Sequence, residues 1–127
     1  MNRFVIENTK STPYIEICYE EQKLSMKGES YPENAYSFYE PIYKLLESYL
    51  LEANKLMVDI QLSYINTSSI KCLIRFFDIL NTNYENGKDI TIHWYYDEDN
   101  GFDYEMGQDF QMDIDIPFEF VSMSSEA

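Results

Sequence analysis

The residues best placed for chemistry are four consecutive polar ones, Asn66, Thr67, Ser68 and Ser69, which join a strand-like segment to a helix-like one. Ligands of open α/β sheets act at such strand-to-helix junctions, where the helix start offers unpaired N–H groups and a positive dipole end. A phosphoryl group on Thr67, or in second place on Ser68, would be held there and would add nearly two negative charges. The same hydroxyls could instead cap the helix, and the pattern leaves both interpretations open.

The segment after this cluster carries two apolar stripes when it is arranged as a helix. One stripe consists of Ile70, Leu73, Ile74, Phe77 and Leu80, and the other of Cys72, Phe76 and Ile79. A helix that packs on a sheet needs only one such stripe, so the second must be covered by another helix of the domain or by a partner protein. We predict a partner-binding surface that comprises Asn66, Ser68, Ser69, Lys71, Cys72, Arg75, Phe76 and Ile79.

Other chemistry has weaker support in the sequence. The single histidine, His93, lies mid-strand, and no serine occupies a Gly-rich nucleophile elbow, so a catalytic triad is not indicated. The acidic run Asp97–Asp103 fails the spacing of a calcium loop, and two distant cysteines with one histidine cannot form a zinc site. We therefore expect a protein that is not an enzyme and that needs neither a metal nor a cofactor.

The elements that would position the hydroxyl cluster follow from periodicity. Alternating apolar residues predict strands at 14–19, 23–27, 56–65, 89–96 and 118–121, and helical spacing predicts helices at about 30–54, 70–83 and 101–112. The order β-β-α-β-α-β-α-β predicts an α/β fold, in which a mixed sheet carries about three helices. We expect residues 1–127 to form a single domain with an ordered core at about 12–121.

Two details concern the first predicted helix. Ser30 precedes Glu33 by three residues, which is the pattern of a capping box and places the helix start at Ser30. Pro41 lies inside the helical pattern, but the apolar stripe keeps its phase across it, so we predict one kinked helix.

Composition limits the possible partners. The 127 residues include 9 Lys and Arg against 23 Asp and Glu, a formal net charge of −14. This balance argues against nucleic acid and against anionic membranes, because both require basic side chains. The 12 Tyr and 8 Phe are too many for a disordered acidic tail. No signal peptide and no disulfide framework are indicated, so we expect a cytoplasmic protein with reduced Cys18 and Cys72.

The junction resembles the phosphorylation site of STAS-type anti-sigma-factor antagonists, in which an Asp-Ser-Ser/Thr-Gly motif opens the corresponding helix. Here Asn66 stands in place of the Asp and Ser69 in place of the Gly. The chain is more similar to the SiaC family of bacterial regulatory phosphoproteins. That resemblance is carried by Ser11-Thr12-Pro13, Leu24-Ser25-Met26, Gly28, Ser30-Tyr31-Pro32-Glu33-Asn34, Asn66-Thr67-Ser68-Ser69-Ile70-Lys71, Trp94 and Tyr96-Asp97.

The resemblance implies a STAS-like domain that acts as a switch in cyclic di-GMP signalling, as in biofilm control. It implies that a dedicated serine/threonine kinase phosphorylates Thr67 and that a PP2C-type phosphatase removes the group. It further implies that the unphosphorylated form binds and activates a GGDEF diguanylate cyclase. A constitutive scaffold, or a partner-switching protein of the anti-sigma-factor-antagonist type, is the alternative.

Overall fold

The strands of this protein lie side by side in the same order as they occur along the chain. The structure, a computed structural model, describes residues 3–124, which form one six-stranded sheet and three helices. The strands are β1 (Arg3–Ile6), β2 (Tyr14–Cys18), β3 (Lys23–Ser30), β4 (Lys55–Ile65), β5 (Asp89–Asp97) and β6 (Phe118–Met123). The helices are α1 (Ala35–Glu52), α2 (Thr67–Glu85) and α3 (Gly101–Gln111).

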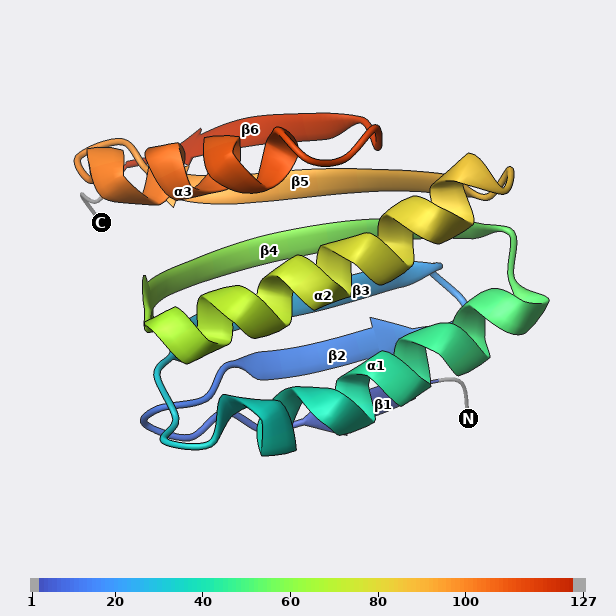
Figure 1. Cartoon of the computed structure of the whole chain (residues 1–127), viewed down its shortest axis with the longest axis horizontal. Coiled ribbons are helices and arrows are strands. Elements are labelled where there is room, and N and C mark those ends of the chain that lie inside the picture. Colours follow the sequence, from blue (N-terminus) through green and yellow to red (C-terminus); the bar gives the residue numbers. More distant parts are fainter. Residues whose placement is uncertain (1–2, 125–127) are drawn as a thin grey trace.

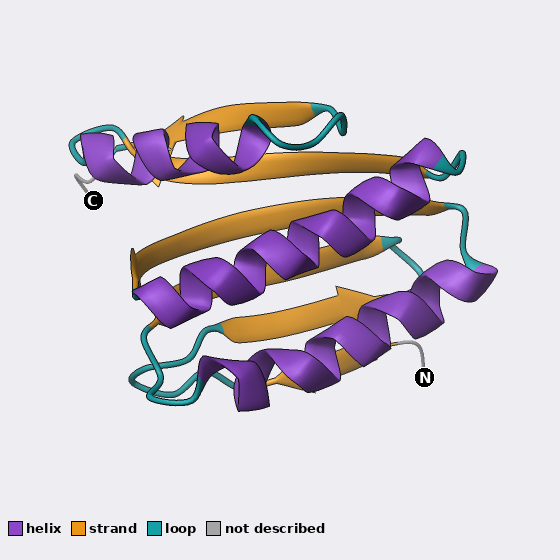
Figure 2. Cartoon of the chain, in the orientation of Figure 1, coloured by secondary structure: helices purple, strands orange, loops and turns teal. Residues whose placement is uncertain are grey.

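The sheet is mixed. Strands β1, β2 and β3 pair antiparallel, whereas β3, β4, β5 and β6 pair parallel, each parallel pair being joined by one helix. When successive parallel connections have the same handedness and each leads to the next strand in the same direction across the sheet, their helices lie on the same face of the sheet. All three helices do lie on one face of this sheet (Figures 1 and 2). The predicted α/β class, with a mixed sheet and three helices, is confirmed.

The core lies between the sheet and the helices. Alternate strand residues point to it and are fully buried, among them Ile15, Ile17, Leu24, Val58, Ile60 and Ile92. On the opposite face of the sheet, the described residues form no helix, and polar, half-buried side chains such as Asp59 and His93 lie there. This period-2 pattern is the reason that the strands could be predicted from the sequence.

Two helix starts differ from the prediction. Ser30 does not cap α1; it is the last residue of β3 and is buried, while the Asn34 side chain accepts from the Ser37 N–H at 3.1 Å and caps the helix. Helix α2 begins at Thr67 and not at 70, because Asn66 caps it. Pro41 lies within a single helix α1, as predicted.

The N-terminal limit of the ordered core is also earlier than the predicted residue 12. Strand β1 pairs with β2 from Arg3↔Cys18 to Ile6↔Ile15 and forms one edge of the sheet. Phe4 and Val5 remain exposed, so the strand shows no buried alternation by which it could be recognised. At the other end, β6 extends past Val121 to Met123, and residues 125–127 lie outside the described part of the chain.

The sheet splits between β4 and β5 toward their carboxyl ends. Pairing of these strands ends at Ile60↔Trp94; beyond it, β4 pairs only with β3 and β5 only with β6. Near its end β4 has a bulge, since Ser63 pairs with Glu29 and Ile65 with Ser30, which leaves Tyr64 as the extra residue. The divergence of the two strands is visible in Figure 1. The split opens the sheet immediately beside the start of α2.

Two further findings bear on the predicted surroundings of the protein. Both cysteines, Cys18 and Cys72, are free. Within residues 3–124, no helix has the length and apolar character needed to cross a membrane.

Candidate functional site

Asn66 fixes the junction between β4 and α2 through hydrogen bonds of its side chain and backbone. Its Oδ1 accepts from the Ser69 N–H at 2.9 Å, which caps the helix, and its Nδ2 donates to the Pro32 carbonyl at 3.1 Å. Its backbone N–H donates to the Ser30 carbonyl at 3.0 Å. The amide side chain thus serves α2 and the loop before α1 at once. Neither Thr67 nor Ser68 is the cap, so the capping interpretation of these two hydroxyls is wrong.

Thr67 and Ser68 occupy the first two positions of α2, and both are exposed. The Ser68 hydroxyl lies 3.4 Å from Asn66 Oδ1, whereas the Thr67 hydroxyl has no hydrogen bond within residues 3–124. The backbone N–H groups of both residues also lack an acceptor in that range, as is usual in the first turn of a helix. Thr67 therefore offers a free hydroxyl next to two free N–H donors at the positive end of a helix.

A buried hydroxyl chain holds this helix start against the rest of the fold. The Ser30 hydroxyl donates to Ser69 Oγ at 2.8 Å, so the Tyr39 hydroxyl, 2.7 Å from Ser30 Oγ, must donate to Ser30. All three residues are buried, and burial raises the pKa of Tyr39 to about 12. These hydrogen-bonded hydroxyls link β3, α1 and α2. They hold the first turn of α2, which carries the exposed Thr67, in a fixed position.

Two cations lie one and two turns beyond Thr67 on α2. Lys71 and Arg75 are exposed, and neither forms an ion pair with any residue from 3 to 124. The Arg75 guanidinium lies 6.0 Å from the centre of the Tyr43 ring on α1. Together with Ser68 they line a hollow of about 550 Å³ against the start of α1. We call Lys71 and Arg75 the basic strip; it is a local exception on a very acidic protein.

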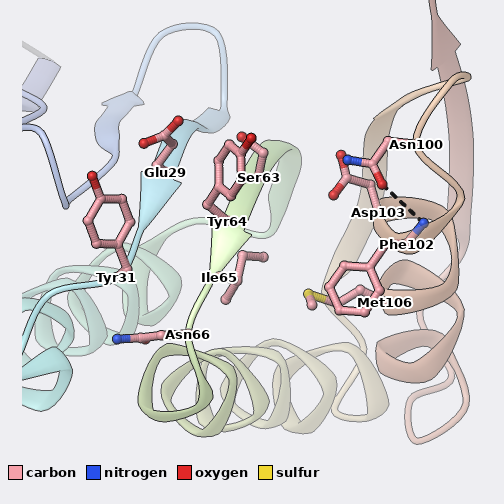
Figure 3. Close-up of a pocket in the computed structure, with 10 residues that line it drawn as sticks. All are labelled: Glu29, Tyr31, Ser63, Tyr64, Ile65, Asn66, Asn100, Phe102, Asp103 and Met106. Carbon is pink, nitrogen blue, oxygen red and sulfur yellow. Dashed lines mark hydrogen bonds between the residues drawn. The ribbon is translucent and has the colours of Figure 1, made fainter.

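Asn66, the residue before Thr67, lines a cleft of about 630 Å³ formed where the sheet splits. Its walls are the ends of β3 and β4 on one side and the first turns of α3 on the other (Figure 3). Three exposed aromatic residues face this cleft: Tyr31, Tyr64 and Phe102, with exposed fractions of 37%, 74% and 67%. Carboxylates of Glu29 and Asp103 also line it, and burial together with the charge of Asp97 raises the pKa of Asp103.

Tyr64 reaches this exposed position through an unusual backbone conformation. Its φ is 51°, the left-handed region that a bulky side chain rarely adopts. In the alternating pattern of β4, Tyr64 shares its register with buried Leu62 and Ile60, but the bulge turns its ring out to solvent. Strain of this kind persists only where the surrounding structure enforces it, and it concentrates at functional sites.

Half of the predicted partner-binding residues are not available to a partner. Ser69, Cys72, Phe76 and Ile79 are buried, at most 8% exposed. Helix α1 covers the stripe that contains Cys72, and the Tyr43 hydroxyl donates to the Cys72 carbonyl at 2.6 Å. The prediction that these four residues contact a partner is wrong, because the second stripe of α2 is an intradomain contact. Thr67, Ser68, Lys71 and Arg75 are exposed around the capping residue Asn66.

The remaining candidate residues have structural surroundings. His93 Nδ1 lies 3.0 Å from Asp59 Oδ1, on the face of the sheet opposite α2, and Lys23 Nζ lies 3.3 Å from Asp59 Oδ2. The acidic run forms a turn in which Asp97 Oδ1 accepts from the Asp99 N–H. The turn leads into α3, where Asn100 Oδ1 accepts from the Phe102 N–H. No group of three potential ligands that could hold a metal ion exists in the described part of the chain.

The structure also gives a role to the motif from Tyr31 to Asn34. Its Pro32 carbonyl accepts from Asn66, and its Asn34 caps α1, so the motif ties the starts of both helices together. Tyr31 lines the cleft and was not among the residues predicted from the sequence, and the same is true of Tyr64 and Phe102. These three aromatic residues come together only in the folded structure. The bulge and the split of the sheet that bring them to the cleft leave no periodic pattern in the sequence.

Comparison with known proteins gives consistent matches over nearly the whole chain. A family model described as SiaC family regulatory phosphoprotein matches residues 6–123. An uncharacterised protein of Pseudomonas aeruginosa (strain UCBPP-PA14) is 34% identical over 119 residues, which is 93% of this chain and 94% of the relative.

Solved structures match equally well. SiaC of Pseudomonas aeruginosa has a TM-score of 0.89 at 32% identity, covering 97% of this chain and 100% of that one. The crystal structure of the diguanylate cyclase SiaD in complex with its activator SiaC, from the same organism, has a chain with a TM-score of 0.90 at 33% identity. That match covers 94% of this chain and 99% of the matching chain.

Proposed function

The chain belongs to the SiaC family of regulatory phosphoproteins, and from this premise we propose that it is a phosphorylation-switched activator of a GGDEF diguanylate cyclase. In this proposal it acts in the cytoplasm and performs no catalysis itself. The unphosphorylated form binds the cyclase and raises cyclic di-GMP. A serine/threonine kinase adds a phosphoryl group to Thr67, and a PP2C-type phosphatase removes it. The related SiaC, described as the activator of SiaD in their complex, supports the choice of partner.

The observation that carries the choice of residue is the exposed Thr67 hydroxyl at the first position of α2. It makes no hydrogen bond within residues 3–124, so modification disrupts no internal contact. Ser69 is excluded because its hydroxyl is buried against Ser30. Ser68 is also exposed, but its hydroxyl already interacts with the capping side chain of Asn66. Thr67 therefore ranks first and Ser68 second.

The consequences of phosphorylation follow from the neighbours of Thr67. A phosphoryl group there can accept from the free N–H groups of the first turn and can pair with Lys71, which lies one helical turn on. The basic strip would then be neutralised and no longer available to the carboxylates of a partner. The total charge of −14 would change little. The switch would therefore work by the position of the new charge, at the start of one helix, and not by its size.

The test uses the purified chain with its cognate kinase and cyclase. Thr67→Ala should take up no phosphate and should still bind and activate the cyclase. Thr67→Glu should fold normally, because an acidic residue at the start of a helix is favourable, yet bind the cyclase at least about tenfold more weakly. Affinity is measured by calorimetry, and the modified peptide is identified by mass spectrometry.

Ser68→Glu is the matched control, since it adds the same charge one residue along the helix. A smaller loss of cyclase affinity than for Thr67→Glu would support Thr67 as the switch. Phosphorylation of Thr67→Ala by the kinase would show that the site is wrong. Equal cyclase binding by wild type, phosphorylated chain and Thr67→Glu would instead support a constitutive scaffold.

A further inference from the structure

A second surface of α2, distinct from the basic strip, faces α3 across an apolar groove. The groove holds about 320 Å³ and continues into the cleft of the split sheet, with which it shares Phe102 and Met106. Helices α2 and α3 diverge toward their N-termini, which opens the groove at that end (Figure 1). Figure 3 shows the side chains of Phe102 and Met106 pointing from α3 into the cleft, toward the ends of β3 and β4.

The floor and walls of this α2–α3 groove are apolar. Phe77 and Phe110 form the floor, with ring centres 4.9 Å apart and both side chains buried. Ile74 on α2 and Phe102 on α3 form the walls and are exposed to 46% and 67%. Exposed apolar side chains of this size on facing helices indicate a surface that binds a partner.

The rim of the groove is acidic. Asp78 on α2 and Glu105, Asp109 and Asp113 on or after α3 line it, all four are exposed, and no basic residue lines it. None of the four forms an ion pair with a residue between 3 and 124. An apolar floor between unpaired carboxylates is complementary to an amphipathic helix that has apolar residues on one face and Lys or Arg beside them.

We propose that the α2–α3 groove docks a basic amphipathic helix of a protein partner. The acidic rim repels an anionic membrane. A second copy of this chain does not fit, because the helices within residues 3–124 carry only three cations, Lys44, Lys71 and Arg75, in a chain of net charge −14. Thr67 does not line the groove, so this docking does not depend on the phosphorylation proposed above.

The test measures binding of a synthetic helical peptide of about 18 residues, with leucines at i, i+3, i+4 and i+7 spacing and arginines elsewhere. The full chain is titrated with this peptide and with a glutamate version, which should not bind. Ile74→Glu should weaken binding of the basic peptide at least about tenfold, although it makes the protein more acidic. Its matched control is Leu51→Glu on α1, where Leu51 is 83% exposed, and there affinity should change less than about twofold.

A second pair of variants separates groove binding from general attraction to an acidic protein. Glu105→Lys with Asp109→Lys changes the net charge from −14 to −10, and Glu47→Lys with Glu52→Lys on α1 does the same. The groove pair should lose about tenfold in affinity and the α1 pair about twofold or less. Equal losses in the two pairs, or unchanged binding by Ile74→Glu, would overturn the proposal. A loss of peptide binding in Thr67→Glu would also overturn the proposal, because it would show that the groove is not independent of the phosphorylation site.

Discussion

Asn66 is the residue on which the geometry of the candidate site depends most. An aspartate could supply the same oxygen to the Ser69 N–H, and an Asp stands at this position in the motif of the STAS-type antagonists that the junction resembles. The second contact, from Nδ2 to the Pro32 carbonyl, needs an amide, because a carboxylate has no proton to donate. In this chain, therefore, the amide links the two helix starts as well as capping α2.

Asn66→Asp should consequently destabilise the fold at neutral pH. The carboxylate keeps the cap and gains from the helix dipole, but it loses the donor and faces a carbonyl oxygen, for a net cost of about 1 kcal/mol. Protonation restores a donor, so the deficit relative to wild type should shrink as the pH falls below about 4. Urea unfolding at several pH values measures this difference.

Asn66→Ser is the companion variant, because serine keeps the cap without a charge and without reach to Pro32. Its deficit should not depend on pH in the same range. If Asn66→Asp were as stable as wild type at pH 7, the link to Pro32 would contribute nothing to folding.

At the residue level, the sequence located the hydroxyl cluster at a strand-to-helix junction but did not reveal the hydrogen-bond partners of its side chains. The hydroxyl cluster was found because four polar residues between apolar segments are conspicuous. Which of them caps the helix depends on the loop before α1, a partner 34 residues away in the sequence. Ser30 was misassigned for a similar reason, since its hydroxyl serves a buried contact with Ser69, 39 residues further on.

At the scale of elements, the position of α3 depends on a glycine. A Cβ on Gly107 would lie 2.7 Å from Cδ1 and Nε1 of Trp94 and 2.8 Å from Cε2 of Phe120. Trp94 is fully buried, and its Nε1 donates to the Asp103 carbonyl on α3 at 3.0 Å. The helix can therefore approach β5 and β6 only because residue 107 has no side chain. This close approach places Phe102 and Met106 at the cleft.

Gly107→Ala should destabilise the protein, although alanine is the better helix former. Overpacking costs about 1–3 kcal/mol, and contacts of 2.7–2.8 Å with two buried or half-buried rings place Gly107→Ala in the upper part of that range, above the roughly 1 kcal/mol gained in helix propensity. Trp94 is the single tryptophan, so its fluorescence reports the displacement of α3 during urea unfolding.

Gly101→Ala at the start of the same helix is the matched control. Nothing lies within 4 Å of a Cβ at that position, so stability should be unchanged or slightly higher. Equal stability of Gly107→Ala and wild type would mean that Trp94 and Phe120 can move aside and that the glycine does not set the position of α3.

The elements themselves were largely predictable, because strands with one buried face and helices with apolar stripes follow simple periods. The stripe of Cys72, Phe76 and Ile79 was also recognised as needing cover, but periodicity cannot say whether α1 or a partner supplies it. The split between β4 and β5 and the bulge at Tyr64 were beyond prediction, since both arise from pairing between strands and not from the pattern within one strand.

For the whole molecule, charge is the dominant feature. The 9 cations cannot neutralise the 23 anions, and the ion pairs formed by arginine or lysine in residues 3–124 are three: Arg3–Glu16, Lys23–Asp59 and Lys44–Glu40. Self-repulsion destabilises a compact chain of this charge, while surface ion pairs stabilise it weakly. Salt screens both effects, and repulsion should prevail because the unpaired carboxylates are far more numerous.

We therefore expect added salt to stabilise the protein. Raising NaCl from about 20 mM to about 500 mM shortens the Debye length from about 20 Å to about 4 Å and should increase the free energy of unfolding by on the order of 1 kcal/mol. Urea midpoints at a series of salt concentrations measure the increment. Both double lysine variants, Glu105→Lys with Asp109→Lys and Glu47→Lys with Glu52→Lys, should show a smaller increment, because each has a net charge of −10. A fall in stability with salt would mean that the few ion pairs outweigh the net repulsion.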